Sequence, residues 1–155
     1  VADLDIIFSK LDQLCEHFGC EKIKTVGDSY MAVSGVPVAA KDHAERVARL
    51  AVAIHQEAKN LKLGGSPIKF RIGIHSGPVV AGVIGRSRFA YDLWGDTVNT
   101  ASRLESTAPA GSTQISMETA ELISSKFNVE LRGQVNMKGK GVLMTNLLIG
   151  PQNKP

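Results

Sequence analysis

The sequence predicts an α/β fold of the α+β sandwich type, in which helices pack on a mostly antiparallel sheet. Two observations carry this prediction: short β-prone runs follow one another across glycine turns, and longer segments between them carry apolar residues at helical spacing. A chain of 155 residues with 43% hydrophobic and 21% charged residues has the size and composition of one globular domain. This composition excludes a disordered chain.

The N-terminal part predicts a helix followed by a hairpin. Apolar side chains recur every three or four positions over residues 4–18, and Gly19 follows as a stop, which indicates a helix with one buried face. Two β-prone runs, 21–26 and 30–34, are separated by a Gly-Asp-Ser turn. The spacing therefore places Asp28 at the tip of a β-hairpin.

The middle of the chain predicts a second helix and a second hairpin. Asp42 and Glu45 form a capping-box pattern at the start of an apolar periodicity that runs to Leu61, where two glycines follow. Residues 68–74 alternate between apolar and other side chains, which predicts a half-buried strand. Residues 79–84 predict its hairpin partner, so we expect these two strands to pair with each other.

The remaining predicted elements are shorter. A polar link at 85–88 leads to a strand from Phe89, and Asp96 is placed to cap a helix that runs to Ser106. Residues 151–155 contain two prolines and polar side chains and predict a disordered tail. Further elements are expected as a strand at 113–116, a helix at 117–126, and strands at 129–132 and 142–149.

Charge and cysteine content restrict the class of protein. Basic residues exceed acidic residues by three, and no run of lysines and arginines has aromatic residues interleaved, so we expect no nucleic acid partner. No stretch reaches the roughly 18 apolar residues of a membrane span, so we expect no membrane contact by this domain. The only two cysteines, Cys15 and Cys20, suit a reduced, cytoplasmic setting.

The first predicted hairpin carries an aspartate at its tip and a lysine in the strand before it. Lys24 stands in the strand four residues before Asp28, which follows Gly27. A carboxylate in a glycine turn can bind a hard cation such as Mg²⁺ because the glycine lets ligands approach closely. Gly-Asp is also ordinary turn chemistry, so the residues alone leave both interpretations open.

The segment from Asp92 to Arg103 carries a second group of candidates. Asn99 and Arg103 are one helical turn apart on one face, and an amide beside a guanidinium suits a ribose or a phosphate. The alternative is a solvated helix face on which Arg103 pairs with Glu105. Asp92 lies on the preceding strand, where it has no evident structural role.

A basic turn near the C-terminus is the third candidate. Lys138 and Lys140 alternate with glycines between two predicted strands, where a lysine offers a point charge toward phosphate. A basic hairpin turn is the simpler alternative. The chain has neither a Walker A pattern nor a dinucleotide-binding glycine fingerprint.

Taken in order, four segments resemble the catalytic domain of class III nucleotidyl cyclases, and they are most similar to bacterial adenylyl cyclases. The resemblance implies a palm-like, ferredoxin-type catalytic domain over residues 1–150, which works as a head-to-tail homodimer with two active sites across the interface. The segments read KIKTVGDSYM at 22–31, RIGIHSG at 71–77, YDLWGDTVNTASR at 91–103 and VNMKGKG at 135–141.

The resemblance also implies a reaction. ATP would be converted to 3′,5′-cyclic AMP and pyrophosphate by attack of its 3′-hydroxyl on the α-phosphate, with two divalent ions, Mg²⁺ or Mn²⁺, as cofactors. Asp28 would be one of two metal-binding carboxylates. Lys24 and Asp92 match the pair that reads adenine, whereas guanylyl cyclases carry Glu and usually Cys at these positions.

The same resemblance assigns roles toward the sugar and the phosphates. Asn99 would position the ribose, and Arg103 would face the phosphate under attack, which makes both catalytic residues. Lys138 would hold the polyphosphate. One subunit would supply Asp28 to a site, and the other would supply the base-reading and transition-state residues.

One part of the family pattern has no counterpart in this sequence. The family places its other metal-binding aspartate on a first strand before the helix that opens this chain, and Asp3 and Asp5 are interpreted as helix N-terminal acids. The catalytic domain is therefore expected to be N-terminally incomplete, with its first strand missing. Two alternatives stand beside an adenylyl cyclase: a non-catalytic nucleotide-binding or dimerisation module, and a guanylyl cyclase, against which Lys24 and Asp92 argue.

Overall fold

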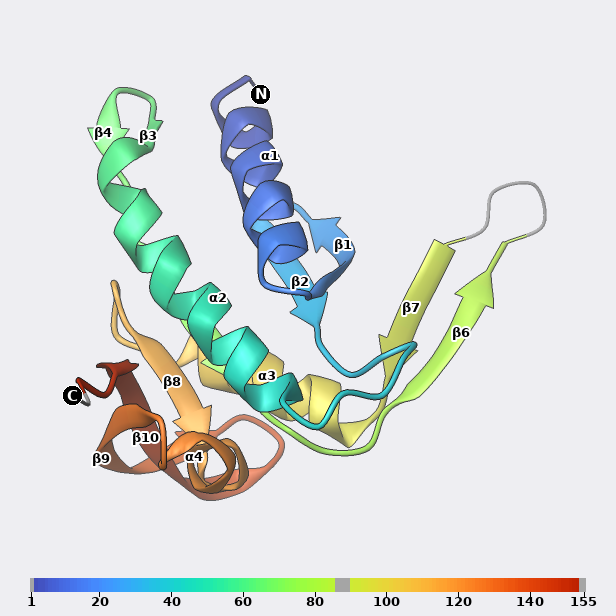
Figure 1. The fold of residues 1–155 in the computed structure, drawn as a ribbon, viewed down its shortest axis with the longest axis vertical. Helices are drawn as coiled ribbons and strands as arrows, with labels where there is room; N and C mark the ends of the chain where they lie inside the picture. The colour runs from blue at the N-terminus through green and yellow to red at the C-terminus, as the bar shows by residue number, and fades with distance from the viewer. Residues whose placement is uncertain (1, 86–89, 154–155) are drawn as a thin grey trace.

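The computed structural model describes residues 2–85 and 90–153, which form four α-helices, one short 3-10 helix and ten strands (Figure 1). The helices are α1 (Ala2–His17), α2 (His43–Glu57), η1 (Ala58–Asn60), α3 (Asp96–Ser106) and α4 (Met117–Ile123). The strands are β1 (Glu21–Val26), β2 (Ser29–Val33), β3 (Lys62–Leu63), β4 (Ser66–Pro67), β5 (Ile72–Ile74), β6 (Val80–Ile84), β7 (Ala90–Trp94), β8 (Thr113–Ser116), β9 (Phe127–Met137) and β10 (Gly141–Pro151).

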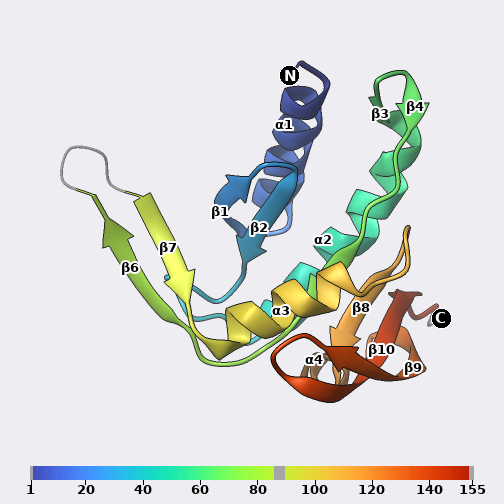
Figure 2. The same ribbon diagram turned by 180° about the vertical axis from the view of Figure 1, so that it is seen from behind.

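A four-stranded sheet in the order β5-β8-β10-β9 forms the centre of the domain. On one face, Ile74, Ile115 and Leu148 pack in a core with alanines of α2 and with α4. The other face carries α3, which lies so close that a Cβ on Gly73 would be 2.2 Å from the backbone nitrogen of Glu105 (Figure 2). The sheet therefore has helices on both faces, and a glycine in β5 permits the approach of α3.

Three two-stranded hairpins, β1-β2, β3-β4 and β6-β7, lie around this sheet. The helix α1 packs beside β1 over a second core, which includes Ile7, Leu11 and Ile54. The β6-β7 hairpin stands away from the body of the molecule and is called the arm below (Figures 1 and 2). Among the described strands every pair except β5-β8 is antiparallel, so the predicted fold class is confirmed.

The predicted second hairpin, of residues 68–74 with 79–84, is wrong. Instead, β5 pairs in parallel with β8, and β6 pairs with β7. The segment between β5 and β6 is held to the start of α3, because Gly77 lies against Thr97 and the Thr97 hydroxyl donates to the carbonyl of Pro78 at 2.6 Å. This attachment directs β6 away from β5 and into the arm.

Of the two predicted helix caps, Asp42 is confirmed in position and Asp96 is wrong. Asp42 is the N-cap residue of α2, but its carboxylate pairs with Nε of Arg46 at 2.9 Å and makes no cap hydrogen bond. The N-cap residue of α3 is Gly95, while Asp96 lies in the first turn and contacts the ammonium group of Lys140. Both carboxylates thus bind a cation instead of backbone N–H groups.

The C-terminal strand extends into the segment that the sequence predicts to be disordered. Pro151 pairs with Phe127 at the end of β10, and the N–H of Gln152 donates to the carbonyl of Lys126 at 2.9 Å. The predicted tail is therefore wrong for its first two residues.

Parts of three predicted segments lie outside the described residues. They are residues 86–88 of the polar link, the strand start at Phe89, and tail residues 154–155. Within the described ranges, no helix combines the length and the apolarity needed to cross a membrane.

Candidate functional site

An ion pair joins the first hairpin to the arm. The Nζ atom of Lys24 on β1 lies 2.8 Å from Oδ2 of Asp92 on β7. The other carboxylate oxygen of Asp92 accepts the N–H of Leu93 at 2.7 Å, and Asp92 is only 9% exposed. The hydrogen bond from Lys24, followed by the one from Leu93, lowers the pKa of Asp92. The fold thus brings Lys24 and Asp92 together and fixes the orientation of the carboxylate.

Asp28 lies exposed in the turn between β1 and β2, as its sequence position predicts. Gly27 before it has a φ of +60°, a left-handed conformation that glycine adopts without strain. Burial raises the pKa of Glu105 on α3, Arg71 lowers it, and the charge of Asp28 raises it further. Three charged side chains therefore gather between the first hairpin, the start of β5 and the end of α3.

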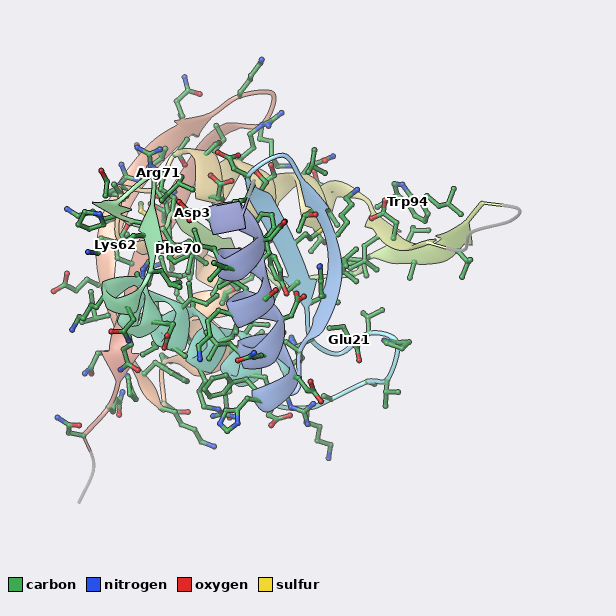
Figure 3. All side chains as sticks on the ribbon, turned by 90° about the horizontal axis from the view of Figure 1, so that it is seen from above. Asp3, Glu21, Lys62, Phe70, Arg71 and Trp94 are labelled. Atoms are coloured by element: carbon green, nitrogen blue, oxygen red, sulfur yellow. The ribbon has the colours of Figure 1, made fainter. Side chains whose placement is uncertain are left out.

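Arg71 is the member of this group that the sequence patterns do not identify as a site residue. It alternates with apolar residues ahead of β5, which predicts only a solvent-facing position on a half-buried strand. Arg71, which is labelled in Figure 3, opens the matched segment RIGIHSG, but its electrostatic interaction with Glu105 is a tertiary feature that this segment does not indicate. A guanidinium at this place suits a phosphate group.

A second basic group lies on α3 and in the turn between β9 and β10. The Nε atom of Arg103 donates to the backbone carbonyl of Lys138 at 2.9 Å. Asn99 lies one turn before Arg103 on the same face of α3 and is exposed. The structure therefore joins Arg103 to the backbone of Lys138, with Asn99 one turn away on α3, and no described ion pair links Arg103 to Glu105.

The helix α3 separates the two charged groups. Consecutive residues of an α-helix are about 100° apart, so Arg103 and Glu105 point about 200° apart around α3. Glu105 interacts with Arg71 and Asp28, and Arg103 contacts Lys138. One chain therefore presents Asp28 and Arg103 on different sides of one helix.

Asp28 is the only predicted metal ligand, and it fits part of a metal site. Among residues 2–85 and 90–153, no three histidine, cysteine or acidic side chains gather closely enough to hold an ion. Mg²⁺ in nucleotide sites is commonly bound by one or two carboxylates together with substrate phosphates. The exposed carboxylate of Asp28 can supply one such ligand beside a bound phosphate.

The motif segments and the fold that carries them agree with a known family. The adenylate and guanylate cyclase catalytic domain model matches residues 1–150. The chain belongs to this family. The resemblance seen in the sequence is confirmed: the chain is an adenylate and guanylate cyclase catalytic domain of class III.

Relatives of both substrate classes are similar to this cyclase domain. An adenylate cyclase of Mycobacterium tuberculosis is 48% identical over 148 residues, which cover 95% of the chain and 33% of that protein. The guanylate cyclase soluble subunit beta-2 of Rattus norvegicus is 42% identical over 149 residues, which cover 94% of the chain and 22% of that protein. Among solved structures, the guanylate cyclase domain of RhGC from Catenaria anguillulae in complex with GTP has a TM-score of 0.92 at 39% identity, over 97% of the chain and 84% of that chain.

Family membership defines the chemistry more firmly than the substrate. The chain spans a third or less of the length of these two curated relatives, which are longer proteins. Cyclases of this class use divalent metal ions, and their catalytic domains function as dimers that bind nucleotide. Because adenylate and guanylate cyclases are similarly close, the choice of purine depends on the residues of the site.

Proposed function

We propose that this domain is an adenylyl cyclase that converts ATP to 3′,5′-cyclic AMP and pyrophosphate at composite sites of a homodimer. The observation that carries the proposal is the 2.8 Å ion pair of Lys24 with Asp92, since it places a hydrogen-bond donor and an ionised acceptor side by side. The 48% identity to a mycobacterial adenylate cyclase supports the proposal.

The Lys24–Asp92 pair suits adenine by the order of its donor and acceptor. Adenine presents an exocyclic amine next to an acceptor ring nitrogen, whereas guanine presents an exocyclic oxygen next to a ring N–H. Asp92 would accept from the amine, and Lys24 would donate to the ring nitrogen. The two side chains cannot exchange roles, because a carboxylate only accepts and an ammonium group only donates. The N–H of Leu93 holds the carboxylate in place while the base replaces Lys24 as its second partner.

The residues on the Arg103 side of α3 would serve the ribose and the phosphates. Asn99 would hydrogen-bond the ribose, and Lys138 would place an ammonium group at the polyphosphate. Arg103 would stabilise the negative charge that grows on the α-phosphate while the 3′-hydroxyl attacks. A guanidinium carries five N–H donors, so the bond from Nε to Lys138 leaves the others for phosphate oxygens.

Asp28 would bind divalent ions, Mg²⁺ or Mn²⁺, together with phosphate oxygens of the substrate. Bound metal supplies activation of the hydroxyl and stabilisation of the leaving oxygens. Arg71 lies near the Asp28 side of α3 and would add a fixed positive charge for the phosphates. Because Asp28 and Arg103 are on different sides of α3, we assign them to different sites of the dimer.

The arm is the surface that we assign to the partner subunit. A two-stranded hairpin that stands alone has little stability in water, and this one exposes several apolar side chains. Trp94 lies on the arm in Figure 3 and is 41% exposed, and Val80 and Val83 are more than 60% exposed. A second copy of the domain would cover these side chains and bring the two half-sites together.

The cellular setting is proposed from the cysteines. Cys15 and Cys20 are both buried and unpaired. Free thiols without a structural disulfide are typical of a reducing compartment, so we propose a cytoplasmic location for this domain.

The proposal is tested by product formation from ATP and, in parallel, from GTP by the purified full-length protein with Mn²⁺. We expect cyclic AMP in clear excess over cyclic GTP, and sedimentation should show a dimer under the conditions of maximal activity. Predominant cyclic GTP would contradict the substrate assignment. A folded, dimeric sample that forms neither cyclic AMP nor cyclic GTP would favour the non-catalytic module.

A further inference from the structure

A glutamine is buried in the centre of the sheet, where apolar side chains are usual. Gln114 on β8 has no exposed surface, and its strand lies between β5 and β10. Its amide nitrogen donates to the carbonyl of Leu104 and to Oγ1 of Thr107, both at 2.8 Å. Its amide oxygen accepts from Nη1 of Arg132. A buried amide costs free energy unless it is hydrogen-bonded, and here each of its polar atoms has a partner.

The contacts of Gln114 converge on the last turn of α3. Thr107 is the C-cap residue of this helix, and its hydroxyl donates to the carbonyl of Arg103 at 2.7 Å. The guanidinium of Arg132 donates to the carbonyl of Thr107, also at 2.7 Å. These bonds join two strands, β8 and β9, to the end of helix α3, just after Arg103. Gln114, Thr107 and Arg132 are called the Gln114 network below.

The network also reaches the residue before Lys138. Met137 is almost fully buried, and its sulfur lies 3.8 Å from the Thr107 hydroxyl. The next carbonyl along the chain, that of Lys138, accepts from Nε of Arg103 at 2.9 Å. Thr107 therefore contacts the backbone of Arg103 directly and is linked to Lys138 through its neighbour Met137.

We infer that the Gln114 network positions Arg103 and Lys138 for the cyclisation step. This inference rests on the proposed function, and it concerns positioning residues, because the network acts on substrate only through Arg103 and Lys138. A displacement of about 1 Å in a reacting group can cost roughly a hundredfold in rate. A defect in the network should therefore lower kcat by more than it raises KM, since Arg103 acts on charge that grows in the transition state.

The test compares Thr107→Val with Thr107→Ser in the full-length protein. Valine removes the hydroxyl at nearly the same volume, and serine keeps it. We expect Thr107→Val to lower kcat for ATP by about tenfold or more with less than about a threefold change in KM. Thr107→Ser should stay within about twofold of the unchanged protein, and Gln114→Leu should reproduce the effect of Thr107→Val.

Thr145→Val is the matched control for loss of a buried hydroxyl. Thr145 on β10 is fully buried, and its hydroxyl donates to the carbonyl of Gly133 at 2.9 Å. We expect a comparable loss of thermal stability and an unchanged kcat. Equal kcat values for Thr107→Val and Thr145→Val at equal folded fraction would overturn the inference.

A second readout does not depend on catalysis. Thr107→Val should increase amide hydrogen exchange over residues 103–107 and also over 137–141, whereas Thr145→Val should leave both segments unchanged. Unchanged exchange over 137–141 in Thr107→Val would overturn the inference whatever nucleotide the enzyme uses. An unchanged protein that is inactive on both nucleotides would contradict the proposed function instead, and the exchange result would still test the coupling.

Discussion

The two sides of the nucleotide site are held in different ways. On the base side, Lys24 and Asp92 form an ion pair at 2.8 Å, so each functional group holds the other in position. On the phosphate side, Arg103 donates to the backbone carbonyl of Lys138. Side chains outside the site, those of the Gln114 network, bind the last turn of α3, which carries Arg103. Activity should therefore depend on the two residues of the base side themselves, whereas on the phosphate side it should also depend on the Gln114 network.

The largest effect is expected from removal of Arg103. Arg103→Ala should lower kcat by about a thousandfold, because an arginine that stabilises the transition state of phosphoryl transfer contributes on the order of 10³ to 10⁵ in rate. Binding of a non-reactive ATP analogue should change by less than about threefold. The measurement pairs steady-state turnover with equilibrium binding.

Arg49→Ala is the control for Arg103→Ala. Arg49 on α2 forms ion pairs with Asp42 and Glu45 that are partly exposed to solvent, and such pairs contribute little to stability. It should leave turnover unchanged. Near-normal turnover in Arg103→Ala would remove this arginine from the phosphate side.

A smaller but specific loss is expected at the Asp28 side of α3. Asp28→Asn should raise the Mg²⁺ concentration for half-maximal activity by at least about tenfold, because even residues that only support metal ligands have effects of this size. Asp5→Asn, an exposed acid of α1, is the control and should leave the metal requirement as it is. An unchanged requirement in Asp28→Asn would show that Asp28 binds no metal.

The base side is tested by exchange of its two residues. Lys24→Glu combined with Asp92→Cys should shift the ratio of kcat/KM for ATP over GTP toward GTP by about 10-fold to 100-fold, the value of one or two hydrogen bonds. Each single change breaks the ion pair without completing a guanine site, so each should lower activity with both nucleotides. A double variant that keeps its preference for ATP would contradict base reading by this pair.

The smallest effect concerns the stability of the central four-stranded sheet. Burial lowers the pKa of His55, whose Nε2 lies 2.9 Å from Oγ1 of Thr113, and it lowers the pKa of His75 on the loop after β5. The unfolded chain then binds protons at higher pH than the folded one. Stability is complete above the ordinary histidine value of 6.5 and is lost as pH falls from there through the folded pKa values.

Chemical unfolding between pH 7.5 and pH 5.5, with both pH limits chosen as roughly one unit either side of the ordinary value, measures this effect. His55→Gln should flatten the pH dependence, and His17→Gln, a change at an exposed position on α1, should not. The preference for ATP should stay constant across this range. A change in preference with pH would mean that the base side is not independent of the sheet.

Local patterns predict the elements whose partners are close in sequence. The helix α1 and the hairpin β1-β2 follow directly from apolar spacing and from one glycine turn. The partner of β5 does not, because β8 begins 39 residues after β5 ends and a parallel pairing leaves no turn signal. The adjacent run 79–84 is the natural local choice, but β6 pairs with β7, and the segment before it lies against Thr97 of α3.

The site residues divide in the same way. Lys24, Asp92 and Arg103 stand in motif segments, so resemblance identifies them even though the sequence alone leaves a structural alternative for each. Arg71 also opens a matched segment, but the resemblance gives it no role, and Gln114 lies outside the matched segments; both look like ordinary alternation until the fold brings α3 against them. Support from outside the site is a tertiary property, and it leaves no local pattern in the sequence.

Mixing two inactive variants tests most directly that Asp28 and Arg103 act in one site from different subunits. Asp28→Asn and Arg103→Ala protein are each assayed alone and then after exchange of subunits at equal concentration. Random pairing makes half of the dimers mixed, and each mixed dimer contains one intact site, so we predict about a quarter of the unchanged activity. A mixture no more active than the two variants alone, in a sample with demonstrated subunit exchange, would contradict the composite site.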